Sequence, residues 1–442
     1  MKTHTVYSVI LILMLAFMPG AVLAQEAVVD NDIGVNARSM GMGGAQIGAV
    51  NDVSAIVYNP AALARLQSTE IQFGVNMLKH STDTVMSSSR GTGDASGVTD
   101  YSGLGSIGFA YPVATERGSL VFGVGLHRVK DFTERYRIDG YNDYQKGYQK
   151  GEMLEEGGMN VASFASAIDV SPNVSVGASI DVWYGNYKRY GRNVINDTDD
   201  VYSQIDIEDV DTDISAWSFK PSVLYFTDAF RLGAFVRLPM TFHLKEKTFW
   251  EWSVMNDGYF YNLYDIPDPT LEYDGADGVE SLSYEIKAPM QFGMGMMWGT
   301  PGYSSIAVDV VHEDWSQAKI TYPASYLPEP NYFRDKYRSA FSWRVGGEKH
   351  IPFLDIVARA GYLRQPLTFK GPRGYESGDP AISVSNERDY ITLGAGKTFD
   401  QSLSLDVSYV HGFWSQDEEP RKDDENIDFV NVTLTYRLPS MF

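Results

Sequence analysis

The 442-residue chain contains no cysteine. This absence excludes disulfides, thiolate metal sites, iron–sulfur clusters and cysteine nucleophiles. The only long apolar run covers residues 9–18, which are too few to cross a bilayer as a helix. Basic residues are also scarce relative to acidic ones, and the net charge of −21 disfavours nucleic acid, whose phosphates need a basic surface. We therefore expect neither a helical membrane protein nor a nucleic-acid-binding protein, and nothing in the composition calls for a cofactor.

The N-terminus has the organisation of an export signal. Lys2 precedes the apolar run, Pro19-Gly20 ends it, and Val22-Leu23-Ala24 offers small residues for cleavage. We expect residues 1–24 to be removed, so that the mature chain begins at Gln25. Because residue 25 is not a cysteine, attachment as a lipoprotein is excluded.

Most of the remaining chain shows the alternation of long β-strands. Beyond about Leu66, apolar and polar residues alternate over stretches roughly twice the typical strand length of soluble proteins, as residues 174–184 and 232–242 illustrate. Such lengths suit tilted membrane strands. The predicted strands cover approximately 66–80, 103–113, 118–132, 158–170, 173–190, 213–226, 229–246, 281–299, 303–316, 337–349, 353–365, 386–399, 402–415 and 427–438. The pattern therefore predicts an all-β, transmembrane antiparallel barrel of about fourteen strands over residues 66–442.

The connections between these strands alternate strictly between short and long. Ser171-Pro172 and Asp400-Gln401 are typical of six tight turns, whereas 133–157 is typical of seven long connections. Bacterial barrels have short periplasmic turns and long external loops, so we expect both termini in the periplasm and long acidic loops outside. The acidic segments Asp197–Asp211 and Asp417–Glu425 are expected to be solvated charge, with divalent-ion binding as the alternative, and no metal site is assigned.

Residues 25–65 differ from the strands in pattern. They are apolar and glycine-rich and lack alternation, as in the run from Ala37 to Ala45. A fourteen-strand barrel encloses a lumen wider than its own side chains can fill, because width grows with strand number. We therefore expect this segment to lie in the lumen as a plug.

The segment from Arg38 to Leu66 resembles the N-terminal hatch of FadL/TodX-like outer-membrane transporters. The resemblance rests on its Met-Gly-x-Gly-Gly-Ala run and on Asn59, Pro60 and Ala61, and weaker similarities occur at 288–293, 309–317 and 344–362. It implies passive uptake of long-chain fatty acids, hydrocarbons or aromatics without an enzymatic step, followed by lateral release. We accordingly expect an outer-membrane monomer that contacts lipids, lipopolysaccharide and a hydrophobic small-molecule ligand.

Two sets of residues are candidates for the cargo route. In the family a kink in the third strand opens the lateral gap, and here that strand carries Gly123 and Gly125, although inward glycines can also simply make room. By alternation four basic residues face inward and are candidates to hold a carboxylate head group, the alternative being a structural charge ladder with inward acids. The basic candidates are Lys220, Arg237, Lys287 and Arg359, and the acids are Asp181, Glu285 and Asp406.

Two further functions stay open at the level of sequence. One subgroup with a similar N-terminus serves protein secretion and surface attachment, so a structural or secretion-associated barrel is the first alternative. An outer-membrane hydrolase is the second, because a catalytic triad can assemble from distant residues. Neither a Gly-x-Ser-x-Gly elbow nor a two-histidine zinc motif occurs in the chain, which disfavours the enzyme.

Overall fold

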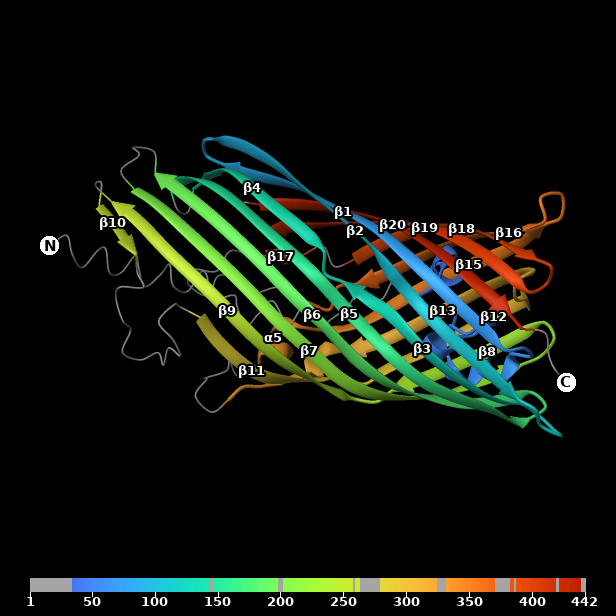
Figure 1. Ribbon diagram of the computed structural model, residues 1–442. Helices are drawn as coiled ribbons and strands as arrows, with labels where there is room; N and C mark the ends of the chain where they lie inside the picture. The colour runs from blue at the N-terminus through green and yellow to red at the C-terminus, as the bar shows by residue number, and fades with distance from the viewer. Residues whose placement is uncertain are drawn as a thin grey trace.

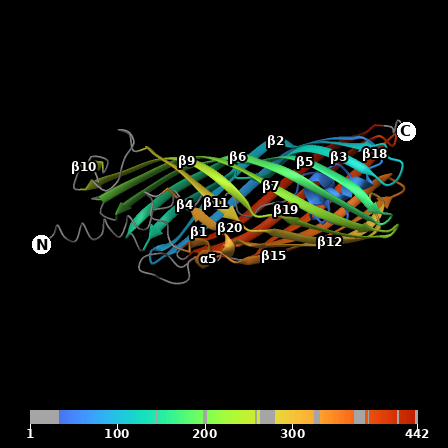
Figure 2. The same ribbon diagram turned by 90° about the horizontal axis from the view of Figure 1, so that it is seen from below.

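A computed structural model describes residues 34–143, 146–197, 202–256, 259–262, 279–323, 331–369, 382–384, 387–418 and 421–438. These residues form a closed antiparallel β-barrel, with the short helices of the N-terminal segment inside one half (Figures 1 and 2). The predicted signal peptide and residues 25–33 lie outside the described residues. No helix among those described is long and apolar enough to cross a membrane.

The wall consists of fourteen strands when only the described residues are counted, and β20 pairs with β1 to close it, as predicted. Four wall strands are interrupted, so that β3 continues as β4, β8 as β9, β11 as β12 and β13 as β14. The strands are β1 (Glu70–Ser88), β2 (Gly91–Val113), β3 (Leu120–Asp131), β4 (Glu134–Asn142), β5 (Gly147–Ser171), β6 (Val174–Asp197), β7 (Tyr202–Phe226), β8 (Phe230–Arg237), β9 (Met240–Asn256), β10 (Tyr259–Asn262), β11 (Val279–Ala288), β12 (Gln291–Thr300), β13 (Ser304–Asp314), β14 (Lys319–Thr321), β15 (Ser339–Ile351), β16 (Ile356–Pro366), β17 (Ile382–Val384), β18 (Glu387–Phe399), β19 (Leu403–Glu418) and β20 (Arg421–Arg437). The helical elements are α3 (Ala37–Gly41), α4 (Ala55–Tyr58), η1 (Pro60–Arg65), η3 (Trp315–Gln317) and α5 (Tyr332–Lys336).

The connections at one end of the barrel are tight turns, as predicted, but those at the other end differ from the prediction. The six tight turns lie at the end where the C-terminus emerges (Figure 1). At the opposite end, much of the sequence predicted as long acidic loops is strand instead. Only Ser89 and Arg90 separate β1 from β2, and β5, β6 and β7 extend over the predicted loops 133–157 and 191–212. A strand surrounded by water needs no apolar outer face, so its sequence lacks the contrast on which the prediction depended.

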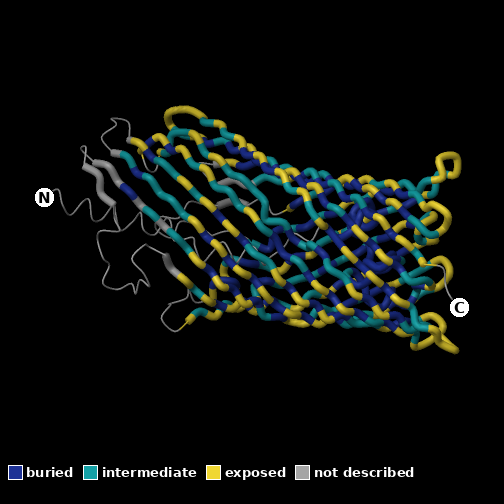
Figure 3. Tube along the Cα trace, viewed as in Figure 1, coloured by how far each residue is buried: buried dark blue, intermediate teal, exposed yellow. Residues whose placement is uncertain are grey.

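The outer surface carries an apolar band. Along β1 the outward residues Ile71, Phe73 and Met77 are apolar and exposed, whereas Lys79 and Asp83 follow on the same face. Figure 3 shows this alternation of exposed and buried positions along the wall strands. Exposed apolar side chains recur on β2, β6, β12 and β18. Because an exposed apolar belt of this extent would be unfavourable in water, the barrel spans a membrane.

In two neighbouring wall strands the inward and outward faces exchange at a proline. Phe235 is buried in β8 and Met240 in β9, so the buried positions change from odd to even numbers across Leu238-Pro239. The same change occurs between β11 and β12, at Pro289-Met290. The register of β9 with β11 and of β8 with β12 puts the two prolines opposite each other. Since proline has no backbone N–H, the ladder is interrupted there.

The exchange of inward and outward faces coincides with a change in the medium around the two strands. On one side of the prolines the outward residues are apolar, for example Phe292 and Met294, and on the other they are polar, for example His243 and Glu285. The strands therefore leave the membrane at this level, and their apolar side chains turn inward. They join a lumenal apolar cluster that includes Phe242, Leu244, Tyr284, Ile286, Trp315 and Phe333. The prediction of one strand with a single uniform alternation over 229–246, and of another over 281–299, is therefore wrong.

The position of the membrane can be tested on one strand. We expect Phe73→Arg to destabilise the folded barrel by about 2–4 kcal/mol, because it places a cation in the lipid, whereas Ser87→Arg on the same outward face beyond the band should cost about 0–1 kcal/mol. Equilibrium unfolding in lipid vesicles measures both values. Equal effects of the two substitutions would contradict the assignment of the band.

Candidate functional site: a lumenal segment and the cavity beside it

Residues 34–66 lie inside the barrel. Nearly every residue from Val35 to Ala64 is buried, and the helices α3, α4 and η1 pack against the inner faces of β5, β6, β18 and β19 (Figures 1 and 3). A capping box at Asn36 and Ser39 starts α3. The segment has only short helices, so many of its backbone N–H and C=O groups must find hydrogen-bond partners elsewhere.

Wall side chains supply these partners. One oxygen of Asp309 on β13 accepts hydrogen bonds from the backbone N–H groups of Gln46 at 2.6 Å and Ile47 at 2.8 Å. Glu70 on β1 accepts from Val53 N–H at 3.0 Å. Threonine hydroxyls of β20 and β18 accept from two further backbone amides in the same way. The wall is therefore matched to the segment's backbone, and not only to its apolar side chains.

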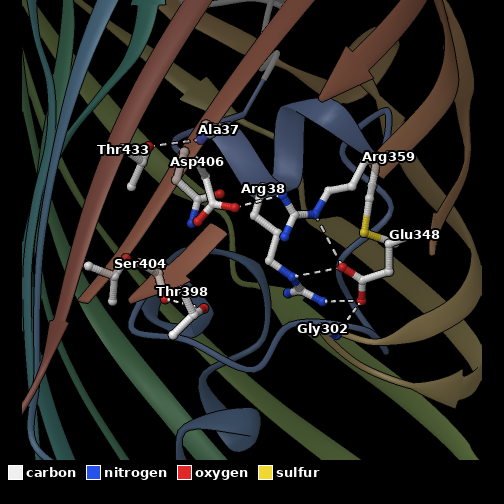
Figure 4. Close-up of polar contacts among 12 residues, drawn as sticks. Ala37, Arg38, Gly302, Glu348, Arg359, Thr398, Ser404, Asp406 and Thr433 are labelled. Carbon is white, nitrogen blue, oxygen red and sulfur yellow. Dashed lines mark hydrogen bonds and ion pairs between the residues drawn. The ribbon is translucent and has the colours of Figure 1, made fainter. Parts of the chain in front are cut away.

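A buried charge network adds a second attachment. Arg38 of α3 pairs with Glu348 of β15 at 2.9 Å, and Arg359 of β16 pairs with the same carboxylate at 3.2 Å (Figure 4). Arg359 also pairs with Asp406 of β19 at 2.6 Å. Glu348 accepts a further hydrogen bond from the backbone N–H of Gly302. Arg359 thus takes part in a structural charge ladder, which was the alternative left open for it.

Asn59, Pro60 and Ala61 form the bend between α4 and η1. Asn59 is extended (φ −155°, ψ 94°), as the following proline favours, and its side chain accepts from Ala61 N–H and donates to the Ile47 carbonyl. The Ala61 amide also donates to the hydroxyl of Ser222 on β7. The bend therefore joins two parts of the segment to the wall.

The structure gives Gly123 and Gly125 a role other than a lateral gap. The ladder from β3 to β2 and to β5 is continuous past both residues. A Cβ at Gly123 would lie 2.9 Å from the Ile56 side chain, so this glycine makes room for the lumenal segment. A Cβ at Gly125 would clash with the His127 ring. The third strand is interrupted further along, at a bulge between Arg128 and Lys130.

A cavity lies between the lumenal segment and the apolar cluster described above. It contains about 770 Å³ of space not filled by protein atoms, part of which is open to solvent. Its lining includes Val35, Ile47, Val57, Val129, Val161, Trp183, Phe235 and Val311 and the polar residues Asp181, Lys220, Arg237, Gln291 and Arg344. A second hollow shares Trp183, Arg237, Gln291, Val311 and Arg344 with it and reaches Met240 and Trp315, at the interrupted ladder.

Two of the four basic candidates, Lys220 and Arg237, line the cavity. Lys220 donates to the backbone carbonyl of Val57 and lies beside the Phe235 ring. Arg237 pairs with Glu313 at 2.9 Å and lies over the Trp183 ring.

Lys287 is exposed on the outer face, together with Glu285, so it does not face the lumen. The face exchange at Pro289 explains this correction, because alternation counted through the proline assigns the wrong side. The corrections for Lys287 and Glu285 therefore have one cause, which is the exchange of faces at Pro289.

Several lumenal residues were missed by reasoning from sequence. Asp309 and Glu348 contact partners 262 and 310 positions away, and no local pattern links such residues. Trp183 could have been recognised from the sequence. It is an aromatic residue at an inward position of β6, where most inward residues are polar or small.

The geometry defines a closed membrane barrel with its N-terminal segment packed in the lumen. Solved structures of other proteins share this fold. A Pseudomonas aeruginosa FadL homologue has the same fold, with a TM-score of 0.64, 14% identity, and coverage of 91% of this chain and 98% of that one. The Pseudomonas putida toluene transporter TodX matches with a TM-score of 0.61, 15% identity, and coverage of 92% and 99%. The Ralstonia pickettii toluene transporter TbuX matches with a TM-score of 0.54, 14% identity, and coverage of 92% and 99%. The predicted FadL/TodX-like fold is confirmed.

The family itself is identified from sequence. The BamG family model matches residues 30–363, which is most of the chain, and the protein therefore belongs to the BamG family. No curated protein sequence matches it.

The charge network makes a stability prediction. Glu348→Gln leaves Arg38 and Arg359 buried without their shared carboxylate, so we expect a loss of about 3–5 kcal/mol in the free energy of unfolding. Glu285→Gln, which removes an exposed pair with His243, should cost no more than about 1 kcal/mol. Urea unfolding in detergent micelles measures both. A Glu348 effect as small as that of Glu285 would show that the network does not hold the lumenal segment.

Proposed function

We propose that the protein is an outer-membrane channel that lets hydrophobic small molecules enter passively and leave sideways into the lipid. The observation that carries this proposal is the cavity between the lumenal segment and the apolar cluster. Concave sites with mostly apolar walls and a few polar groups are the usual sites for small ligands. The fold shared with a FadL homologue and with two toluene transporters supports the same role.

The cavity favours a neutral cargo over a fatty acid. Lys220 and Arg237 are engaged with the Val57 carbonyl and with Glu313 respectively. A carboxylate ligand would have to compete with these partners, whereas a neutral hydrocarbon or aromatic compound needs only the apolar lining. The aromatic rings of Trp183 and Phe235 offer surfaces on which an aromatic ring can pack.

The proposed exit is the interrupted ladder at Pro239 and Pro289 rather than the third-strand glycines. The second hollow reaches this interruption through Arg237, Met240 and Gln291. The outward residues on its membrane side are apolar. An apolar molecule that leaves here keeps its surface out of water, which is favourable by the hydrophobic effect.

The remaining parts of the role concern location and closure. We propose export by residues 1–24, a monomeric barrel in contact with outer-membrane lipids and lipopolysaccharide, and closure of the lumen by the N-terminal segment. The burial of residues 35–64 and their hydrogen bonds to the wall support the closure. No chemical step is included in the proposal.

A structural or secretion-associated barrel is the second candidate. It stays a candidate because the transporters are matched in fold alone, at about 15% identity. In that case the cavity would have no small-molecule cargo, and filling it would leave the protein's role unchanged.

Filling the cavity separates the two candidates. Val161→Trp places a bulky side chain in the lining, and we expect it to weaken toluene binding at least tenfold, about 1.4 kcal/mol, and to reduce uptake. The matched control is Ile180→Trp, at an exposed outward position of the neighbouring strand β6. Binding is measured on purified protein and uptake in cells, with a long-chain fatty acid as a second ligand. If the unmodified protein binds neither ligand and uptake does not depend on it, the channel proposal fails.

A further inference from the structure

A histidine and two glutamates meet inside the barrel beyond the membrane. His80 lies on β1, Glu134 begins β4 and Glu425 lies on β20. On the outward faces of β1 and β20, the apolar pair Met77 and Val430 is followed by a charged pair, Lys79 with Asp428. The three residues therefore lie outside the membrane-spanning part of the wall, with their side chains directed into the lumen.

The geometry of the three side chains suits a metal ion. The Nε2 atom of His80 lies 3.2 Å from Oε2 of Glu425 and 3.8 Å from Oε1 of Glu134, and the three atoms are all within 4.8 Å of one another. Zinc binds imidazole nitrogen and carboxylate oxygen at about 2.0–2.2 Å, so tetrahedral ligands lie about 3.4 Å apart. Only a small contraction is needed to place one ion between these atoms.

The charges of the cluster leave room for a cation. Glu134, Glu155 and Glu425 come together around one imidazole, and Oε1 of Glu134 has no hydrogen-bond partner although it is buried. That oxygen lies 3.8 Å from Nε2 of His80, and a dication between the two atoms would give it a closer partner.

Surrounding groups orient the ligands as they do in metal sites. Tyr136 donates a hydrogen bond to Oε1 of Glu425 at 3.1 Å, which leaves Oε2 toward His80. The imidazole of His80 also hydrogen-bonds the backbone of Thr133. A histidine that binds a metal typically gives its other ring nitrogen to a carbonyl or carboxylate, and ligating carboxylates are themselves hydrogen-bonded.

We propose that His80, Glu134 and Glu425 bind one first-row divalent cation of the zinc type. The site would join β4 to β1 and β20 at a place where the ladder does not. The pairing of β2 with β3 ends at Ser106 and His127, and β4 instead packs on the inner face of the β1–β2 hairpin. The metal would therefore fasten the extension of the third strand to the far side of that interruption.

Metal titration of the purified full-length barrel tests the proposal. After treatment with a chelator, we expect one equivalent of Zn²⁺ to bind, and Co²⁺ to bind in its place with a visible absorption band of a low-coordinate site. His80→Gln and Glu134→Gln should each weaken Zn²⁺ binding at least tenfold. The control is His411→Gln, which changes a half-exposed histidine bonded to Asp428 and should leave binding unchanged.

The variants must first be shown to fold, by the different gel migration of boiled and unboiled protein. If the chelated barrel takes up no Zn²⁺, or if both variants fold and bind it as tightly as the unmodified protein, the proposal is overturned. Displacement of Zn²⁺ by equimolar Ca²⁺ would also overturn it, because that result indicates general binding to acidic surface. Metal-dependent protection of residues 134–142 from hydrogen exchange would support the fastening of β4.

Discussion

The buried backbone of residues 34–66 must find hydrogen-bond partners inside the barrel, and this requirement organises the lumen. Buried peptide groups without partners are strongly disfavoured, and the segment has only short helices with which to satisfy its own. Asp309 and Glu70 accept from its backbone amides, and Glu348 binds its Arg38. Where the segment lies, the inner wall accordingly carries these polar side chains beside apolar ones such as Val121 and Leu224, and the larger apolar cluster lies beyond it.

The cavity follows from the boundary between these two regions. Within the membrane the wall strands turn apolar residues to the lipid, and both polar and apolar residues to the lumenal segment. Beyond the membrane, the exchange of faces at Pro239 and Pro289 sends Phe242 and Ile286 inward. The space left between the lumenal segment and this cluster is the candidate binding site. The same prolines interrupt the ladder beside it, so the site and its proposed exit have one structural origin.

The alternation of apolar and polar residues was enough to predict the strand number and the antiparallel order. The lumenal position of the N-terminal segment was predicted from its lack of alternation and from the width of a fourteen-strand lumen. The alternation failed where its premises did not hold. Lys287 was placed on the wrong face because one proline exchanges the faces of its strand, and the acidic loops proved to be strands because water on both sides removes the contrast. Contacts such as His80 with Glu425, 345 positions apart, depend on closure of the barrel and have no local signature.

The claim on which the account most depends is that residues 34–66 close the lumen. Deletion of residues 38–61 removes the helix α3, the charge pair of Arg38 and the amides bound by Asp309, and leaves the wall strands intact. The conductance of the deletion variant in planar lipid bilayers, compared with that of the full-length barrel, tests the claim directly. The account predicts large, stable ion-conducting steps for a variant that still migrates as a folded barrel on unboiled gels. A folded deletion variant with the same low conductance as the full-length protein would contradict it.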